Sequence, residues 1–256
     1  MTTRATKSTT AKQGTPKPKA SRDTNQYANP PKTLDEHYFY RLRLDEDQKK
    51  FRQAIWDKDI QIVFCDARAG TGKTTIAVAT ADLLVKYGLF SEIIYITSAC
   101  HERKQGFLSG SLYEKSREYF APLYDALETI GIQAEKVIHS DDVITEKYDP
   151  PYITAITDTY IRGRNFGNAD KKVIVIADES QNMTMIQLKT LLSRIGEGSM
   201  AIVIGHSKQC DLLSVATSGF TRCLRHYSDR EWAAACTLTK NYRSKISQWA
   251  DEMPDN

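Results

Sequence analysis

Residues 60–75 are Ile60-Gln61-Ile62-Val63-Phe64-Cys65-Asp66-Ala67-Arg68-Ala69-Gly70-Thr71-Gly72-Lys73-Thr74-Thr75, and this stretch decides the fold of the 256-residue chain. Its first half is apolar and rich in β-branched residues, which predicts a buried strand. Gly70 and Gly72 then turn the chain, and residues 76–81 predict the start of a helix. A strand, a glycine loop, Lys-Thr and a helix in this order are typical of a P-loop.

The residue types of this loop suit phosphate binding. Glycines let backbone N–H groups converge on an anion, and the helix N-terminus adds partial positive charge. Lys73 can reach the β- and γ-phosphates of ATP, and the Thr74 hydroxyl can ligate Mg²⁺. In one departure from G-x-x-x-x-G-K-[ST], Ala67 takes the place of the first glycine. We expect the nucleotide to contact Ala69, Gly70, Thr71, Gly72, Lys73, Thr74 and Thr75.

A second strong pattern lies at residues 173–179. The apolar run at 173–177 predicts a strand in the middle of a parallel sheet, and it ends in Asp178 and Glu179. Ligands bind at the carboxyl ends of strands in open α/β sheets. We therefore expect Asp178 to hold Mg²⁺ through water and Glu179 to polarise the water that attacks the γ-phosphate.

The rest of the chain alternates between strands and helices. Further strands are predicted at residues 92–97, 152–156, 200–205 and 234–238, and helices at 44–56, 112–127, 183–195 and from 241 onward. Pro122 is expected to kink or interrupt the helix at 112–127. This alternation predicts an α/β fold, in which helices cover both faces of a mainly parallel central sheet.

Three polar residues near these elements are further candidates for the site. Gln48, on the helix before the P-loop strand, could hydrogen bond to adenine through its amide or could be an ordinary surface residue. After the strand at 200–205, either Gln209 or His206 could lie beside the γ-phosphate, or each could form only a local hydrogen bond.

Composition indicates the class of protein. Residues 1–32 hold seven Lys or Arg and one acid, with almost nothing to bury, so we expect a disordered basic tail at 1–33 and one folded domain at 34–256. The tail could contact nucleic acid or could only improve solubility. The five scattered cysteines form no C-x-x-C pair, which favours reduced thiols. With no apolar run near the ~20 residues of a membrane span and no secretory signal, we expect a cytoplasmic protein without a membrane partner.

Four stretches together resemble the PhoH-like family, the phosphate-starvation-inducible P-loop ATPases related to superfamily 1 helicase cores. The resemblance covers roughly residues 44–250. It is carried by Ala69-Gly70-Thr71-Gly72-Lys73-Thr74, by Gly106-Phe107-Leu108-Ser109-Gly110 with Lys115 and residues 122–127, by Arg162-Gly163-Arg164, and by Asp178-Glu179-Ser180-Gln181-Asn182 with Arg194-Ile195-Gly196. It implies a RecA-like P-loop NTPase fold, commonly assembled as a ring, and a link to RNA or DNA unwinding.

The resemblance also implies roles for single residues. Gln48 resembles the adenine-reading glutamine, Gln209 the γ-phosphate sensor, and Arg243 a finger onto ATP in a neighbouring subunit. Arg162 and Arg164 could act directly or form structural ion pairs. Beyond Ala67-Arg68, the chain departs from the family pattern at Ser98-Ala99 and at His206, where the family has Asp.

These features predict a Mg²⁺-dependent ATPase that remodels or unwinds RNA or single-stranded DNA. One RecA-like core is too little for a translocating monomer, so we expect a homo-oligomeric ring, a hexamer. Two alternatives stay open: an ATP-gated assembly factor with weak or no hydrolysis, which Ala67 and His206 make credible, and a P-loop phosphotransferase.

Overall fold

The computed structural model describes residues 27–34, 39–98, 119–139, 150–212, 217–251 and 253. Its centre is a six-stranded sheet in the order β3-β2-β4-β5-β1-β6, and neighbouring strands of this sheet run parallel to each other. The strands are β1 (Ile62–Ala67), β2 (Glu92–Thr97), β3 (Ile153–Thr157), β4 (Val173–Asp178), β5 (Met200–Gly205) and β6 (Ala233–Leu238). The predicted parallel α/β sheet is therefore confirmed.

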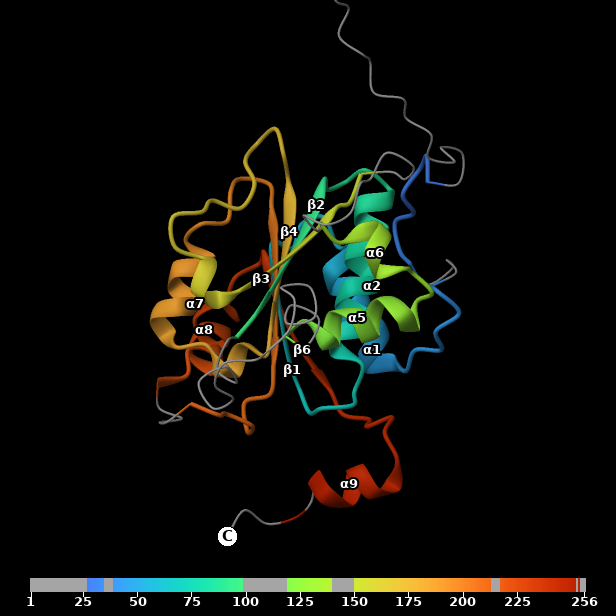
Figure 1. Cartoon of the computed structure of the whole chain (residues 1–256), viewed down its shortest axis with the longest axis vertical. Helices are drawn as coiled ribbons and strands as arrows, with labels where there is room; N and C mark the ends of the chain where they lie inside the picture. Colours follow the sequence, from blue (N-terminus) through green and yellow to red (C-terminus); the bar gives the residue numbers. More distant parts are fainter. Residues whose placement is uncertain are drawn as a thin grey trace, which may run out of the picture.

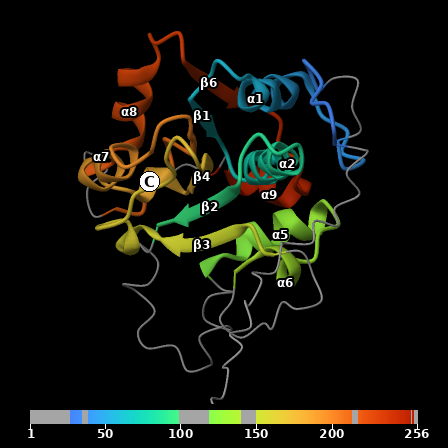
Figure 2. The same ribbon diagram turned by 90° about the horizontal axis from the view of Figure 1, so that it is seen from above.

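Helices cover both faces of the sheet, as Figures 1 and 2 show. On one face lie α1 (Glu46–Trp56), α2 (Lys73–Lys86), α5 (Ala121–Thr129) and the single turn α6 (Ala134–Val137). On the other face lie α7 (Met185–Leu192) and α8 (Phe220–Tyr227). The last helix, α9 (Lys245–Asp251), stands apart from the sheet at the end where β1 leads into α2. No helix in the described part of the chain is long and apolar enough to cross a membrane.

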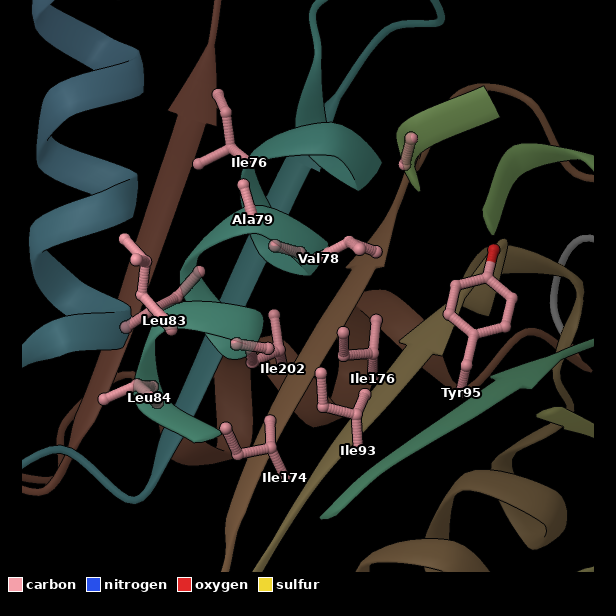
Figure 3. Packing of buried hydrophobic residues seen from close by; sticks show 14 of the residues in the cluster. Ile76, Val78, Ala79, Leu83, Leu84, Ile93, Tyr95, Ile174, Ile176 and Ile202 are labelled. Atoms are coloured by element: carbon pink, nitrogen blue, oxygen red, sulfur yellow. The ribbon is translucent and has the colours of Figure 1, made fainter. Parts of the chain in front are cut away.

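The strands are apolar on both sides because both faces are buried. On β2, Ile93 and Tyr95 face α2 and α5, whereas Ile94 and Ile96 belong to the core beneath α7 and α8. Figure 3 shows the first of these cores, where Tyr95 stands on β2 beside Ile93 and opposite the apolar side chains of α2. The two cores hold the sheet rigid, so the ends of its strands keep fixed positions.

The order of the strands brings the P-loop and Asp178 together at the same end of the sheet. β1 carries the P-loop, β4 carries Asp178, and β5 lies between them. All three are parallel, so their carboxyl ends meet on the same side of the sheet. This arrangement is that of a RecA-like P-loop NTPase core, as the sequence predicted.

Several predicted boundaries differ from the structure. Pro122 lies in the first turn of α5, where a missing N–H costs nothing, so the expected interruption of the helix at this proline is confirmed; residues 112–118 of the predicted helix lie outside the described residues. The last helix begins at Lys245, four residues later than predicted. The predicted helix at 183–195 is shorter, because Thr184 caps it with its own side chain and the chain leaves the helix after Leu192.

The N-terminal segment 27–34 packs on the fold. The indole N–H of Trp56 donates to the carbonyl of Pro31 at 2.9 Å, and Leu34 is fully buried. The ring of Tyr27 lies edge-on to the ring of Tyr87, with centroids 5.1 Å apart. The predicted tail boundary after residue 33 therefore lies within a packed segment, since these few apolar contacts are too sparse to show in the composition.

Candidate nucleotide-binding site

The P-loop has the backbone that its glycines allow. Gly70 and Gly72 have φ of 76° and 83°, in the left-handed region that other residues enter at a cost, and Gly72 is the N-cap of α2. The hydroxyl of Thr71 donates to the carbonyl of Arg68 at 2.9 Å and closes the loop. Ala67 is the last residue of β1 and has no positive φ, so its Cβ is tolerated where the motif has glycine.

A pocket of about 470 Å³ opens over this loop. The predicted residues that line it are Gln48, Ala69, Gly70, Gly72, Lys73, Thr74, Thr75, Glu179 and Arg243. Thr71 is buried and does not line the pocket, so its predicted contact with the nucleotide stays a prediction. The lining also includes Leu42, Arg43, Leu44, Pro122, Asp125, Ala126 and Thr129. The first three of these residues precede α1 and the last four belong to α5, so two separate parts of the chain complete the lining of the pocket.

Thr74 and Asp178 meet across 104 residues of sequence. The Thr74 hydroxyl donates to Oδ2 of Asp178 at 2.8 Å. A hydroxyl and a carboxylate are hard oxygen donors, and Mg²⁺ is usually held by one or two protein oxygens together with substrate phosphates. The pair therefore fits the Mg²⁺ ion that the P-loop implies.

The Asp178 carboxylate is held at both oxygens. The phenol of Tyr95 donates to Oδ2 at 2.7 Å, and the backbone N–H of Glu179 donates to Oδ1 at 2.8 Å. Burial and the neighbouring Glu179 raise the pKa of Asp178, although Lys73 and the two hydroxyl donors oppose the rise. A fully buried carboxylate of this kind favours a cation beside it, because a cation compensates the charge that water cannot reach.

Glu179 has a strained backbone. Its φ of 50° and ψ of 37° are left-handed, a conformation that costs about 1–3 kcal/mol outside glycine and is concentrated at functional sites. The side-chain amide of Gln181 donates to Oε2 of Glu179 at 2.5 Å and accepts from the backbone N–H of His206 at 3.0 Å. Gln181 thus connects Glu179 to the end of β5.

Gln48 lines the pocket, and its side-chain amide is bonded within the protein. Its Nε2 donates to the carbonyl of Thr71 at 2.9 Å, and its Oε1 accepts from the N–H of Asp45 at 3.1 Å. Both ends of the amide are therefore used within the protein, where they join α1 to the P-loop. Adenine reading remains a prediction that would require these bonds to open.

Arg243 lies at the P-loop of its own chain, and its predicted role as a finger onto ATP in a neighbouring subunit stays a prediction. A Cβ added to Gly70 would come within 2.6 Å of Cγ of Arg243. The segment before α9 is fixed here because the N–H of Tyr242 donates to the carbonyl of Gly70 at 2.8 Å and its phenol donates to Asp45 at 2.8 Å. Arg243 therefore lines the pocket over the glycine loop of its own chain.

The remaining predicted residues lie away from the pocket lining. Gln209 is exposed, its N–H donates to the carbonyl of His206 at 3.1 Å, and its sensor role stays a prediction. Arg162 and Arg164 are exposed on the connection between β3 and β4. Residues 106–110 and Lys115, which carried part of the family resemblance, lie outside the described residues.

Two residues that organise the site carry no clear signal in the sequence. The apolar pattern indicates only that Tyr95 belongs to a strand. It lies two residues before the end of β2, where its phenol can reach Asp178 at the end of the neighbouring strand β4. Gln181 belongs to the Asp-Glu-x-Gln-Asn motif, but nothing in its spacing shows that it bridges Glu179 and His206.

Comparisons with known proteins place this geometry in a family. The model of the family described as PhoH-like protein matches residues 43–253. A PhoH-like protein of Synechocystis is 36% identical over 196 residues, which are 75% of this chain and 56% of that protein. Protein PhoH of Escherichia coli K12 is 33% identical over 211 residues, 81% of this chain and 56% of that protein. The chain thus spans about half the length of the curated relatives it matches.

Similarity to solved structures is weaker. The large terminase of bacteriophage HK97 has a TM-score of 0.49 at 14% identity, covering 83% of this chain and 48% of the terminase chain. A SWI2/SNF2 ATPase core of Sulfolobus solfataricus, solved with double-stranded DNA, has a TM-score of 0.44 at 15% identity, covering 81% and 47%.

Proposed function

The chain belongs to the PhoH-like protein family, and from this membership we propose that it binds and hydrolyses Mg²⁺-ATP and couples turnover to remodelling of RNA or single-stranded DNA in a homo-oligomeric ring. One observation carries the hydrolysis proposal: the Thr74 hydroxyl lies 2.8 Å from the Asp178 carboxylate at the mouth of the glycine loop. The family is that of P-loop ATPases, and this contact is the geometry that a shared Mg²⁺ requires.

Each residue of the pocket has a separate task in the proposed reaction. The amides around Gly70 and Gly72 and the buried Lys73 hold the phosphates of ATP. Thr74 and Asp178 hold Mg²⁺, which when bound neutralises charge that develops on the transferred phosphoryl group.

Glu179 accepts a proton from the attacking water. Gln181 fixes the carboxylate of Glu179 through Oε2, and the other carboxylate oxygen, Oε1, would accept the proton. Arg243, at the pocket in cis, adds positive charge beside the phosphates.

The nucleic-acid and ring parts of the proposal have broader support. The described part of the chain forms one RecA-like core, and translocation on nucleic acid needs a second core, which a neighbouring copy would supply. The exposed Arg162 and Arg164 and the seven basic residues of positions 1–32 offer charge for phosphate contacts.

The test measures binding and turnover separately. Calorimetry with Mg²⁺-ATP should give a binding isotherm for the wild type and for Glu179→Gln, and none for Lys73→Ala. Steady-state phosphate release, with and without single-stranded RNA and DNA, should be abolished in Glu179→Gln and kept in the control Glu197→Gln, an exposed glutamate of the α7–β5 loop.

Each failure has its own meaning. If the wild-type protein gives no binding isotherm with Mg²⁺-ATP, the proposed nucleotide site is refuted. Binding without phosphate release, together with ATP-dependent assembly, supports the assembly factor in place of the ATPase.

A further inference from the structure

A buried carboxylate on α2 joins three parts of the chain outside the nucleotide pocket. The side chain of Asp82 is fully buried. The phenol of Tyr40 donates to its Oδ2, and the phenol of Tyr152, the residue before β3, donates to its Oδ1. The ammonium of Lys86 lies 2.7 Å from Oδ2. A buried charge is tolerated when it is paired and hydrogen bonded, so this cluster fixes the segments that meet in it.

Tyr40 belongs to a turn with a strained backbone, just before α1. Tyr40 and Arg41 have φ of 47° and 59°, in the left-handed region that residues other than glycine enter at a cost. The N–H of Leu42 donates to the carbonyl of Phe39 at 2.8 Å and closes the turn. Such strain persists only where the surrounding structure enforces it, and it is concentrated at ligand-binding segments. We name residues 39–44 the strap.

Two helices enforce this turn. Cζ of Arg52, on α1, lies 5.2 Å from the centroid of the buried Phe39 ring. On α2, the ammonium of Lys86 lies 5.3 Å from the centroid of the Tyr40 ring, beside the bond to Asp82. Burial and the Asp82 carboxylate raise the pKa of Tyr40, so its phenol keeps the proton that it donates. The two helices lie side by side, so the turn is held by a rigid support (Figures 1 and 2).

The rest of the strap forms part of the nucleotide pocket. Leu42, Arg43 and Leu44 all line it. The strap then meets Asp45, whose carboxylate caps α1 and accepts from the phenol of Tyr242 at 2.8 Å. In the proposed site the glycine loop holds the phosphates, so the apolar side chains of the strap are suited to the base.

Tyr40 acts on the pocket from a distance. It does not line the pocket, and its partner Asp82 lies nine residues after Lys73 on α2. Nine residues of α-helix rise about 13 Å. The hydroxyl of Tyr40 is therefore placed to hold the strap, and the strap is the part of the chain that contacts the ligand.

We propose that Tyr40 is a positioning residue for the nucleotide: its bond to Asp82 holds the strained turn, and the turn presents Leu42 and Leu44 to the base of the bound nucleoside triphosphate. The inference rests on the proposed nucleotide site and adds the group that determines how tightly the base is held. Without the Tyr40 hydroxyl the turn relaxes and the strap leaves the pocket, whereas the glycine loop keeps its place.

The test compares the two tyrosines that share Asp82. Tyr40→Phe and Tyr152→Phe each remove one donor from the same buried carboxylate, so urea unfolding should show similar losses of stability. In calorimetry, the Kd for Mg²⁺-ATP should rise about tenfold in Tyr40→Phe, as for a lost hydrogen bond to a charged group, and less than about twofold in Tyr152→Phe. Mg²⁺-tripolyphosphate, which lacks the base, should bind to both variants as it does to the wild type.

A second substitution in the turn provides a rescue. Glycine enters the left-handed region without strain, and Arg41 is an exposed residue. Adding Arg41→Gly to Tyr40→Phe should therefore restore the turn and bring the Kd for Mg²⁺-ATP to within about threefold of the wild type. No gain from this glycine would contradict the role given to the strained turn.

Hydrogen exchange without nucleotide measures the strap itself. The amide of Leu42, which is bonded to Phe39, should exchange faster in Tyr40→Phe and at the wild-type rate in Tyr152→Phe. Unchanged exchange, equal ATP affinity in the two variants, or an equal loss of tripolyphosphate binding overturns the proposal. A wild type that binds no Mg²⁺-ATP refutes the nucleotide site and with it this role, whereas equally tight binding by the wild type and Tyr40→Phe refutes only the role of Tyr40.

Discussion

Gly70 offers a direct measure of how the C-terminal segment is joined to the P-loop. Its φ of +76° is in the left-handed region, and a Cβ there would meet Cγ of Arg243 and Oδ1 of Asn241, each at 2.6 Å. Gly88 has nearly the same backbone, with φ of +70°, but a Cβ there meets nothing within 4 Å. The two Gly→Ala substitutions therefore share the backbone strain and differ in the steric contact.

The expected magnitudes follow from this difference. An alanine in the left-handed region costs about 1–2 kcal/mol, so Gly88→Ala should lower the free energy of unfolding by about that amount. Gly70→Ala should cost a further ~1 kcal/mol, because displacing Arg243 also strains the hydrogen bond from Tyr242 to Gly70. For a domain of this size, each kcal/mol lowers Tm by about 2–4 °C.

The assay combines urea unfolding with calorimetry of Mg²⁺-ATP binding. Gly70→Ala should lose both stability and ATP affinity, whereas Gly88→Ala should lose only stability. In an Arg243→Ala background the additional loss at Gly70 should shrink, since one of the two clashing side chains is gone. Equal destabilisation by the two alanines, with unchanged ATP affinity, would refute the inferred contact between the C-terminal segment and the P-loop.

Three further predictions concern single side chains. Glu179→Gln should reduce phosphate release by about 100-fold or more while ATP affinity is kept, as removal of a general base requires, and calorimetry beside a phosphate assay checks both. Tyr95→Phe removes a donor to the Asp178 carboxylate worth about 1.5–3 kcal/mol, so the Mg²⁺ concentration for half-maximal ATP binding should rise about tenfold or more, and an unchanged Mg²⁺ titration would contradict that role. Burial raises the pKa of Glu92, but hydrogen bonds from Lys171 and Thr154 outweigh it and lower the pKa below its usual value. The stabilisation from Glu92 is therefore present above the pKa that this residue has in the unfolded chain, and it is lost as pH falls through its lower pKa in the folded chain. In urea unfolding between pH 3 and 7, the free energy of unfolding should depend less on pH in Glu92→Gln than in the wild type. At pH 7 the variant should lose no more than about 1 kcal/mol of unfolding free energy.

The sequence could predict the elements that have a periodic or motif signal. The apolar strands at 62–67 and 173–178, the glycine loop between β1 and α2, and the acids at the end of β4 are all visible in it, because local residue type dictates them. The pairing of Thr74 with Asp178 also follows, since parallel strands bring their carboxyl ends to one edge. The interruption at Pro122 follows from the proline itself, but the start of the last helix at Lys245 does not follow, because capping and tertiary contacts decide where a helix begins.

What the sequence by itself determined is thus the chemistry of the site: a phosphate-binding loop, a lysine, and two hard oxygens for a cation. Only the tertiary structure decided which groups hold these residues in place. Tyr95 becomes a partner of Asp178 because β2 lies beside β4, Gln181 accepts from the N–H of His206 because β5 lies beside β4, and Arg243 lies at its own P-loop because Tyr242 is bonded to Gly70. These contacts join residues far apart in the chain through single hydrogen bonds, and no local pattern of residues encodes a contact of that kind.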